Sequence, residues 1–167
     1  MKLYAHPFLS YCQKALIALY ENDTPFEFRL LEGEAVFAEL IALWPVRKFP
    51  VLRDGDRAVV EATAIIEHLA VHHPGPVRLI PLDHAKAIEV RMMDRVFDYH
   101  VSTPQQKLVA DAAPALFYAD WSHPIDDRFA TLKAYRARLL ARPSMARVVD
   151  EDRRYRSYFP LSAPDRD

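Results

Sequence analysis

Apolar positions in the first half of the chain follow two spacings that alternate with one another. Between residues 25 and 31, Phe26, Phe28 and Leu30 occupy every second position, which predicts a half-buried strand. Other segments repeat apolar residues at intervals of three and four, the spacing of one helix face. Residues 2–5, 10–20, 25–31 and 35–43 predict strand, helix, strand and helix, and residues 51–71 predict a strand pair followed by a helix.

The segment from Pro50 to Glu61 has the sharpest local pattern. Proline lacks an amide hydrogen and fits the first position of a strand, and Asp54-Gly55 between two short apolar runs predicts a tight hairpin turn. From Glu61 onward the spacing becomes helical. A helix start beside such a strand presents unpaired backbone groups and the positive end of the helix dipole, which suits an extended, peptide-like ligand with a carboxylate.

The second half of the chain predicts helices alone. His73-Pro-Gly-Pro76 is the expected start of a linker, and Asp83 is the expected cap of the next helix. The helices are expected over residues 83–99, 115–121, 127–140 and 144–156. Two domains are therefore predicted, an α/β domain over residues 1–75 and an all-helical domain over residues 83–160.

Composition narrows the class of protein. With 51% hydrophobic and 27% charged residues, the 167-residue chain has the composition of a globular protein. A net charge of −1 gives no field to recruit nucleic acid or an anionic membrane, and the three glycines do not cluster as a nucleotide-binding loop requires. A single cysteine, no visible secretory signal and no run of about 20 apolar residues favour a cytoplasmic protein without a membrane span.

Several segments share their order and spacing with a known family. Phe49-Pro50-Val51-Leu52 is followed by Asp54-Gly55 and then by Glu61-Ala62. This order resembles the glutathione transferase family, where the segments read Val-Pro-Val-Leu, Asp-Gly and Glu-Ser. Residues 1–19 look like that family's first strand and helix, and residues 139–144 like part of its late helical domain.

The resemblance implies a fold of two parts. A thioredoxin-like α/β N-terminal domain would be followed by an all-α C-terminal domain of the glutathione transferase type. That second domain is short by about 40 residues compared with the size expected of two ordinary domains. The internal deletion is expected near residues 107–115.

The resemblance also implies where glutathione binds. Phe49 precedes an expected cis proline, Pro50, and its backbone would pair with the cysteinyl part of the tripeptide. Glu61 would accept from the γ-glutamyl ammonium, although a carboxylate at a helix start also complements the dipole without any ligand. Ala62 stands where the family has serine, which removes a hydrogen bond to the γ-glutamyl carboxylate unless Thr63 replaces it. The implied binding residues are Lys48, Phe49, Pro50, Val51, Glu61, Ala62 and Thr63.

Glutathione chemistry requires a thiolate, and a free thiol titrates near a pKa of about 8.5. The family places a hydroxyl or thiol at the end of the first strand or the start of the first helix, and that position falls on Leu9, which cannot donate. Ser10 is the next candidate donor, or else the N-cap of a capping box with Gln13. Cys12 matches the second position of a glutaredoxin-like Cys-x-x-Cys whose first position is again Leu9, or it is a small buried residue.

Other residues of interest each have a structural alternative. His68 and His72 lie four apart on a predicted helix, a spacing that can bind zinc, but no third ligand is evident and no metal site is predicted. Met93 and Phe97 would line an apolar substrate pocket or belong to an ordinary core. Lys48 would attract the glycyl carboxylate of glutathione or form part of a solvated basic turn.

Three functions follow from these residues. The first is a transferase-like enzyme that uses glutathione as co-substrate on a small electrophile and assembles as a homodimer, with an active site degenerate at Leu9 and Ala62. The second is a binding or interaction protein that kept the fold and lost the chemistry. The third, a glutaredoxin-like thiol reductase, conflicts with Leu9. The residues do not identify the electrophile.

Overall fold

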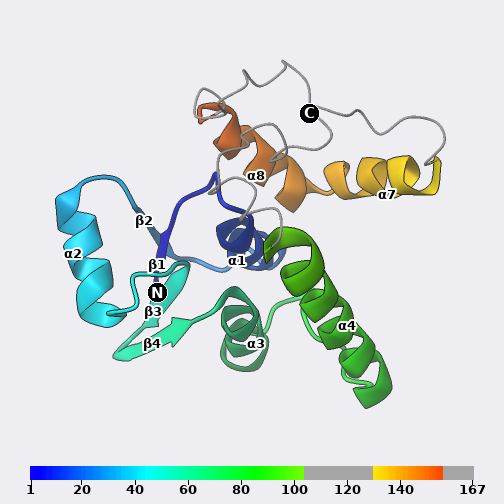
Figure 1. Ribbon diagram of the computed structural model, residues 1–167. Coiled ribbons are helices and arrows are strands. Elements are labelled where there is room, and N and C mark those ends of the chain that lie inside the picture. Colours follow the sequence, from blue (N-terminus) through cyan, green and yellow to red (C-terminus); the bar gives the residue numbers. More distant parts are fainter. Residues whose placement is uncertain (104–129, 156–167) are drawn as a thin grey trace. The chain divides into compact units, whose positions relative to one another are not determined.

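A computed structural model of the chain describes residues 1–103 and 130–155 (Figure 1). The chain divides into two compact units, Met1–Ala87 and Ile88–Asp167. The helix predicted at 115–121 and the shortening predicted near 107–115 lie outside the described residues. Within the described ranges, no helix combines the length and apolarity needed to cross a lipid bilayer.

The first unit is a four-stranded mixed sheet with three helices. Its elements are, in chain order, β1 (Lys2–Ala5), α1 (Ser10–Glu21), β2 (Glu27–Leu30), α2 (Glu34–Leu43), β3 (Val51–Asp54), β4 (Arg57–Val60) and α3 (Ala62–His72). The strand order is β2-β1-β3-β4, with β1 parallel to β2 and antiparallel to β3, and β4 antiparallel to β3. This is the thioredoxin-like arrangement, and the predicted order of elements is confirmed.

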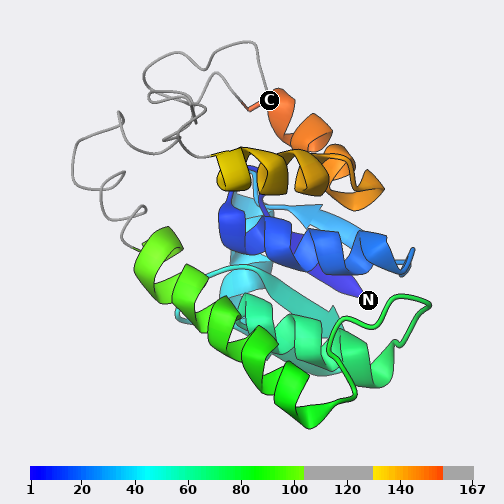
Figure 2. The same cartoon turned by 90° about the vertical axis from the view of Figure 1, so that its right-hand side faces the viewer.

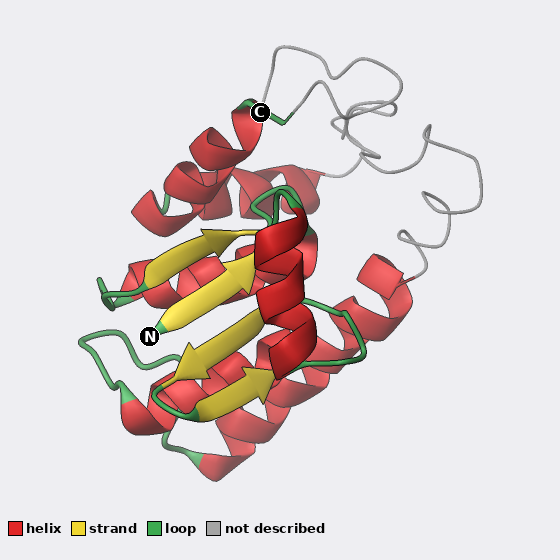
Figure 3. Cartoon of the chain, turned by 90° about the vertical axis from the view of Figure 1, so that its left-hand side faces the viewer, coloured by secondary structure: helices red, strands yellow, loops and turns green. Residues whose placement is uncertain are grey.

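The helices cover the two faces of this sheet unequally. Helices α1 and α3 lie side by side on one face, and α2 alone crosses the other (Figures 2 and 3). Because successive strand residues point to opposite faces, Leu3 and its partner Leu52 face one way while Tyr4 and its partner Val51 face the other. The core residues between the sheet and the α1 and α3 layer include Leu3, Cys12, Leu16, Leu52, Ile65 and Leu69, all buried.

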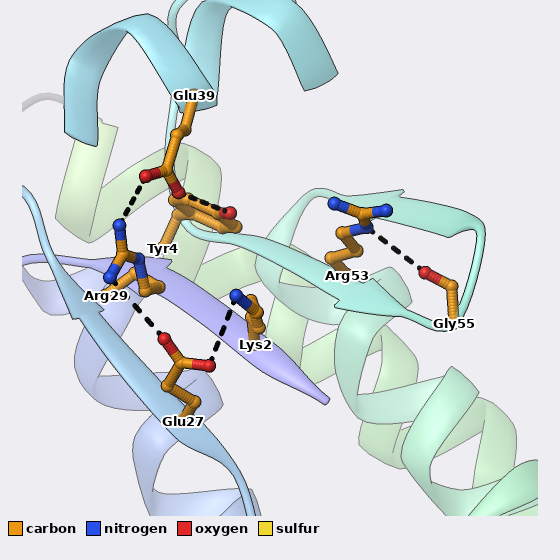
Figure 4. Close-up of polar contacts among 7 residues, drawn as sticks. All are labelled: Lys2, Tyr4, Glu27, Arg29, Glu39, Arg53 and Gly55. Atoms are coloured by element: carbon orange, nitrogen blue, oxygen red, sulfur yellow. Dashed lines mark hydrogen bonds and ion pairs between the residues drawn. The ribbon is translucent and has the colours of Figure 1, made fainter. Parts of the chain in front are cut away.

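The face under α2 joins an apolar cluster to a polar network. Tyr4 packs with buried Leu31, Leu40 and Val51. Its hydroxyl donates to Glu39 Oε2 at 2.9 Å, and Glu39 is also paired with Arg29 (Figure 4). Burial is the main cause that raises the pKa of Tyr4, with the hydrogen bond to Glu39 second. Tyr4 therefore packs in this cluster, and its hydroxyl is satisfied inside the unit.

The β3–β4 hairpin turns at the predicted Asp54-Gly55. Gly55 has φ +58°, a conformation that a residue without Cβ adopts readily. Arg53 Nε donates to the Gly55 carbonyl at 3.1 Å (Figure 4). Asp54 pairs with Arg57 in the ladder, so the turn holds only two residues between the strands.

The end of α1 is tied to the segment that follows α3 by one side chain. Asn22 Nδ2 donates to the Val77 carbonyl at 2.9 Å, and the Val77 amide donates to Asn22 Oδ1 at 2.8 Å. The side-chain amide thus imitates the paired hydrogen bonds of a neighbouring strand. These two hydrogen bonds between Asn22 and Val77 are called the Asn22 clamp below. Gly75 packs closely against it, because a Cβ built on Gly75 would lie 2.4 Å from Asn22 Cγ.

The described remainder of the chain is helical. Asp83 caps α4 (His84–Phe97), since its Oδ1 accepts from the Lys86 amide at 2.9 Å, as the sequence predicted. A π-helical segment, Asp98–Ser102, follows directly. Helices α7 (Ala130–Leu140) and α8 (Pro143–Arg153) match the predicted helices at 127–140 and 144–156 within a few residues over their described parts.

Candidate functional site

Several of the predicted glutathione-binding residues lie at the start of β3. The Phe49–Pro50 peptide bond is cis, as the resemblance implied. Pro50 is buried, and Phe49 is half-buried against the cluster around Tyr4. Val51 pairs with Val60 in the β3–β4 ladder, so the next position outward on each strand is Pro50 on one side and Glu61 on the other. The hairpin therefore brings two of the predicted binding residues to one edge of the sheet.

Glu61 begins α3 in an unusual backbone conformation. It is the N-cap of α3, with φ +68° and ψ +125°, and its carbonyl accepts from the Ile65 amide at 3.0 Å. A positive φ is uncommon for a residue with a Cβ, and such strain concentrates at ligand-binding and catalytic positions. The side chain is exposed, as a carboxylate that meets a ligand must be. No sequence pattern signals this conformation, because glycine or asparagine is the residue expected there.

The next two residues of α3 differ in their surroundings. Ala62 is buried, with 4% of its surface exposed, and its side chain can form no hydrogen bond. Thr63 Oγ1 accepts from Lys14 Nζ of α1 at 3.4 Å. Lys14 therefore adds a positive charge beside the start of α3. Sequence reasoning missed Lys14, because its link to Thr63 joins residues 49 positions apart and depends on how α1 packs against α3.

The basic residues before Pro50 lie at the surface. Arg47 and Lys48 are both exposed, and the Arg47 amide donates to the Trp44 carbonyl at 3.0 Å in a turn after α2. Arg47 has φ +60°, which makes it a second residue with a Cβ in the positive-φ region near this edge. Glycine adopts this conformation more readily than a residue with a Cβ does.

The start of α1 corrects one prediction. The N-cap of α1 is Leu9, with φ −104° and no side-chain hydrogen bond, and the Gln13 amide donates to the Leu9 carbonyl at 2.9 Å. The capping box predicted for Ser10 and Gln13 is therefore wrong, because Ser10 lies one residue inside the helix. Its side chain is exposed at the first position of α1, beside the positive end of the helix dipole.

Cys12 is inert in this fold. Its side chain is fully buried, and burial raises the pKa of its thiol to about 12, although the His6 amide approaches the Sγ atom at 3.4 Å and opposes that shift. At neutral pH the residue is a neutral thiol without access to solvent. The prediction of a small buried residue is confirmed, and Cys12 provides no thiol for exchange with a disulfide.

His68 of α3 and His73, the residue after α3, both contact the carboxylate of Asp54. His68 Nε2 lies 2.9 Å from Asp54 Oδ2, and His73 Nε2 lies 2.6 Å from the same oxygen. The sequence made no third ligand evident for His68 and His72, and the structure instead places Asp54 and His73 beside His68. Asp54 comes from the hairpin and His73 from beyond the helix, so helical periodicity gave no signal for either.

The residues predicted for an apolar pocket lie on α4. Met93 is 44% exposed and Phe97 is 49% exposed. Both therefore remain outside the cores of the described residues. Their assignment to a substrate pocket stays a prediction.

Comparison with known proteins agrees with the geometry of the first unit. Residues 3–77 match the family model for the glutathione S-transferase N-terminal domain. Glutathione S-transferase F6 of Arabidopsis thaliana is 34% identical over 73 residues, which cover 42% of this chain and 35% of the relative. Glutathione S-transferase F10 of the same plant is 28% identical over 134 residues, which cover 77% of this chain and 60% of the relative.

A solved structure extends the likeness to most of the chain. The crystal structure of a glutathione transferase homolog from Burkholderia with bound glutathione aligns with a TM-score of 0.65 at 20% identity, covering 92% of this chain and 97% of that one. At that identity the likeness concerns the fold, a thioredoxin-like domain followed by a helical part. The chain spans 35% to 60% of the length of the two curated relatives. Residues 3–77 therefore form a domain of the glutathione S-transferase N-terminal type, and the chain as a whole shares the glutathione transferase fold.

Proposed function

We propose that the chain binds glutathione at the start of β3 and α3 and uses its activated thiol on a small electrophile. The observation that carries the proposal is the register of the hairpin. Val51 and Val60 are paired, which brings Pro50 to the same edge as Glu61, an exposed carboxylate in a strained conformation. A tripeptide that lies along this edge meets the backbone of β3 and the open end of α3 together.

Each polar group at the start of α3 has a counterpart on glutathione. Glu61 accepts from the γ-glutamyl ammonium, and the first backbone N–H groups of α3, together with its dipole, favour the γ-glutamyl carboxylate. Ala62 contributes no hydroxyl to that carboxylate. Lys14, which donates to Thr63, adds positive charge at this point and offsets part of the loss.

Activation of the thiol depends on the start of α1. Lowering a thiol pKa by two units from about 8.5 requires about 2.7 kcal/mol of preferential stabilisation of the thiolate. Ser10 supplies a hydroxyl donor at the first position of α1, where the dipole also favours an anion. In the reaction the thiol proton passes to solvent, the sulfur forms a bond to the electrophilic atom, and the leaving group departs with its electron pair.

A second function has one observation in its favour. Leu9, the residue at the family's usual donor position, is the N-cap of α1 and brings no polar atom to it. A protein that binds glutathione without activating it would have this arrangement. A glutaredoxin-like reductase has no such support, since Cys12 is buried with a pKa raised to about 12.

Calorimetric titration with glutathione at neutral pH tests the proposal, with the ultraviolet absorbance of the bound thiolate followed in the same samples. We expect the native chain to bind with a thiolate signal and Ser10→Ala to bind without it. Thr131→Ala, which removes an exposed hydroxyl from α7, is the control and retains both. Leu9→Ser adds the family's donor and raises the signal only if Ser10 is a weak activator.

The outcomes separate the two functions. Binding by the native chain without a thiolate signal refutes the transferase and supports the binding protein. No binding refutes the use of glutathione altogether and leaves a thioredoxin-like fold that serves in interaction. The proposal also includes a homodimer in a reducing, cytoplasmic compartment, which sedimentation of the full chain and its cellular location check.

A further inference from the structure

Three ligand-type side chains converge at the far end of the hairpin from Pro50 and Glu61. His68 Nε2 and His73 Nε2 lie 2.9 Å and 2.6 Å from one oxygen of Asp54. The three candidate ligand atoms all lie within 4.8 Å of one another. This set is called the Asp54 cluster below.

The fold brings the Asp54 cluster together from two elements. Asp54 is the last residue of β3, at the turn where Gly55 takes φ +58°. His68 lies on α3, and His73 is the residue at which the helix ends, with φ −132° and its amide bonded to the Leu69 carbonyl. Because His73 leaves the helical path, its ring reaches the same carboxylate as His68, although the two residues are five apart.

Burial gives the cluster a closed side and an open side. The His68 side chain is 8% exposed, whereas Asp54 and His73 are 25% and 31% exposed. Solvent therefore reaches Asp54 and His73 more readily than His68.

We propose that the Asp54 cluster is a binding site for a divalent transition-metal ion, with Zn²⁺ as the expected occupant. Two imidazole nitrogens and one carboxylate oxygen form a donor set that zinc accepts together with a water molecule. Tetrahedral bonds of about 2.0–2.2 Å separate neighbouring ligand atoms by about 3.3 Å. Each histidine nitrogen must then move outward from Asp54 by less than about 1 Å, and the two nitrogens, which lie within 4.8 Å of each other, must come to about the same 3.3 Å separation. His73, with a side chain 31% exposed, has the more room to adjust.

The metal site is separate from the proposed glutathione site. Helix α3 has 11 residues and is about 16 Å long, with Glu61 at its start and His73 at its end. A metal ion at the Asp54 cluster would not touch a thiol held near Glu61. It would instead join the hairpin turn to the end of α3, so the inference does not rest on the proposed function.

His72 offers a matched control for the experiment. It neighbours His73 in the chain, and its ring centroid lies 4.5 Å from that of His68, yet it is not part of the Asp54 cluster. A site that depended only on the four-residue spacing of His68 and His72 would need His72. The proposed site needs His73 and Asp54 instead.

Zinc titration of the full chain tests the proposal. The protein is first stripped of metal with a chelator, and zinc binding is then measured by competition with a chromophoric zinc indicator. We expect one equivalent to bind to the native chain and to His72→Gln with the same affinity. His73→Gln and Asp54→Asn should each weaken that equivalent by about 10- to 100-fold, the loss seen when even an outer partner of a metal ligand is removed. Cobalt absorbance in the visible range gives an independent readout of the same ligands.

Thermal unfolding guards against misfolded variants. Asn at position 54 keeps a hydrogen-bond acceptor for both histidines, so circular dichroism of Asp54→Asn should match that of the native chain. Zinc should raise the unfolding midpoint of the native chain and of His72→Gln but not that of Asp54→Asn. The proposal is overturned if no equivalent binds, if His73→Gln binds like the native chain, or if His72→Gln loses the metal. The first of these outcomes leaves a hydrogen-bonded triad without a metal.

Discussion

Helices α2 and α3 both follow an N-cap residue with a positive φ, but the residue is glycine in one and glutamate in the other. The N-cap of α2 is Gly33, with φ +83° and ψ +156°, and the N-cap of α3 is Glu61, with φ +68° and ψ +125°. Glycine adopts a positive φ without steric penalty, whereas a residue with a Cβ at such a position costs about 1–3 kcal/mol. One helix start is therefore relaxed, and the other is strained.

The difference indicates what the carboxylate of Glu61 is for. A cap that served only to start a helix could be glycine, as at α2. Retention of a strained glutamate at α3 is explained by a role for its exposed side chain, and the proposed γ-glutamyl ammonium supplies one.

The largest effect is expected at Cys12, the single cysteine of the chain. With the pKa raised to about 12, the folded protein should hold about 3,000-fold less thiolate than an unfolded chain with a pKa of about 8.5. Iodoacetamide should therefore alkylate Cys12 slowly in buffer and rapidly in denaturant, as followed by intact-protein mass spectrometry. Equal rates in the two conditions would contradict burial of the thiol.

The raised pKa of Cys12 also predicts how the free energy of unfolding depends on pH. The folded chain keeps a proton on Cys12 that the unfolded chain loses above about pH 8.5, so this residue leaves the free energy of unfolding unchanged below that pH and lowers it toward pH 12. Cys12→Ala should lose less stability than the native chain over that alkaline range, as measured by urea unfolding.

Glu61→Gln sharpens the comparison at the level of binding. Removing the charge weakens the hydrogen bonds to an ammonium group, and we expect the glutathione dissociation constant to rise about 10-fold or more. Glu34→Gln is the matched control, since Glu34 is an exposed glutamate directly after the Gly33 cap. Calorimetry should show no change for Glu34→Gln. An equal loss in both variants would indicate an effect of net charge alone.

Glu61→Gly and Gly33→Ala form a reciprocal pair that measures the strain itself. Glycine at position 61 should raise the free energy of unfolding by about 1 kcal/mol, the relief of strain less the entropy of glycine in the unfolded chain. Alanine at position 33 should lower it by about 1–3 kcal/mol through the backbone alone, because a Cβ there meets nothing within 4 Å. Urea unfolding measures both. A destabilised Glu61→Gly would contradict a strained native glutamate.

Local patterns predicted most of the elements of the first unit. The alternation in residues 25–31 and the Asp54-Gly55 turn depend on neighbours in the chain, and both are present in the structure. The capping box failed because Leu9 and Ser10 are both compatible with a helix start, and only the packing of α1 decides between them.

The candidate sites depend on contacts that no short window of sequence contains. Lys14 meets Thr63 across two packed helices, and Asp54 meets His73 across 19 positions. The positive φ of Glu61 could not be predicted from the sequence either, because glutamate rarely adopts this conformation. The family resemblance predicted the glutathione site near Pro50 and Glu61, whereas the Asp54 cluster became evident only in the three-dimensional structure.

The Asn22 clamp has an evolutionary consequence. Any side chain at position 75 would collide with Asn22, whose amide is held by two hydrogen bonds to Val77. A lineage that enlarges residue 75 must first shorten residue 22 and so release the segment after α3. Positions 22 and 75 are therefore coupled by packing, and in descendants of this chain we expect a change at one to be accompanied by a change at the other.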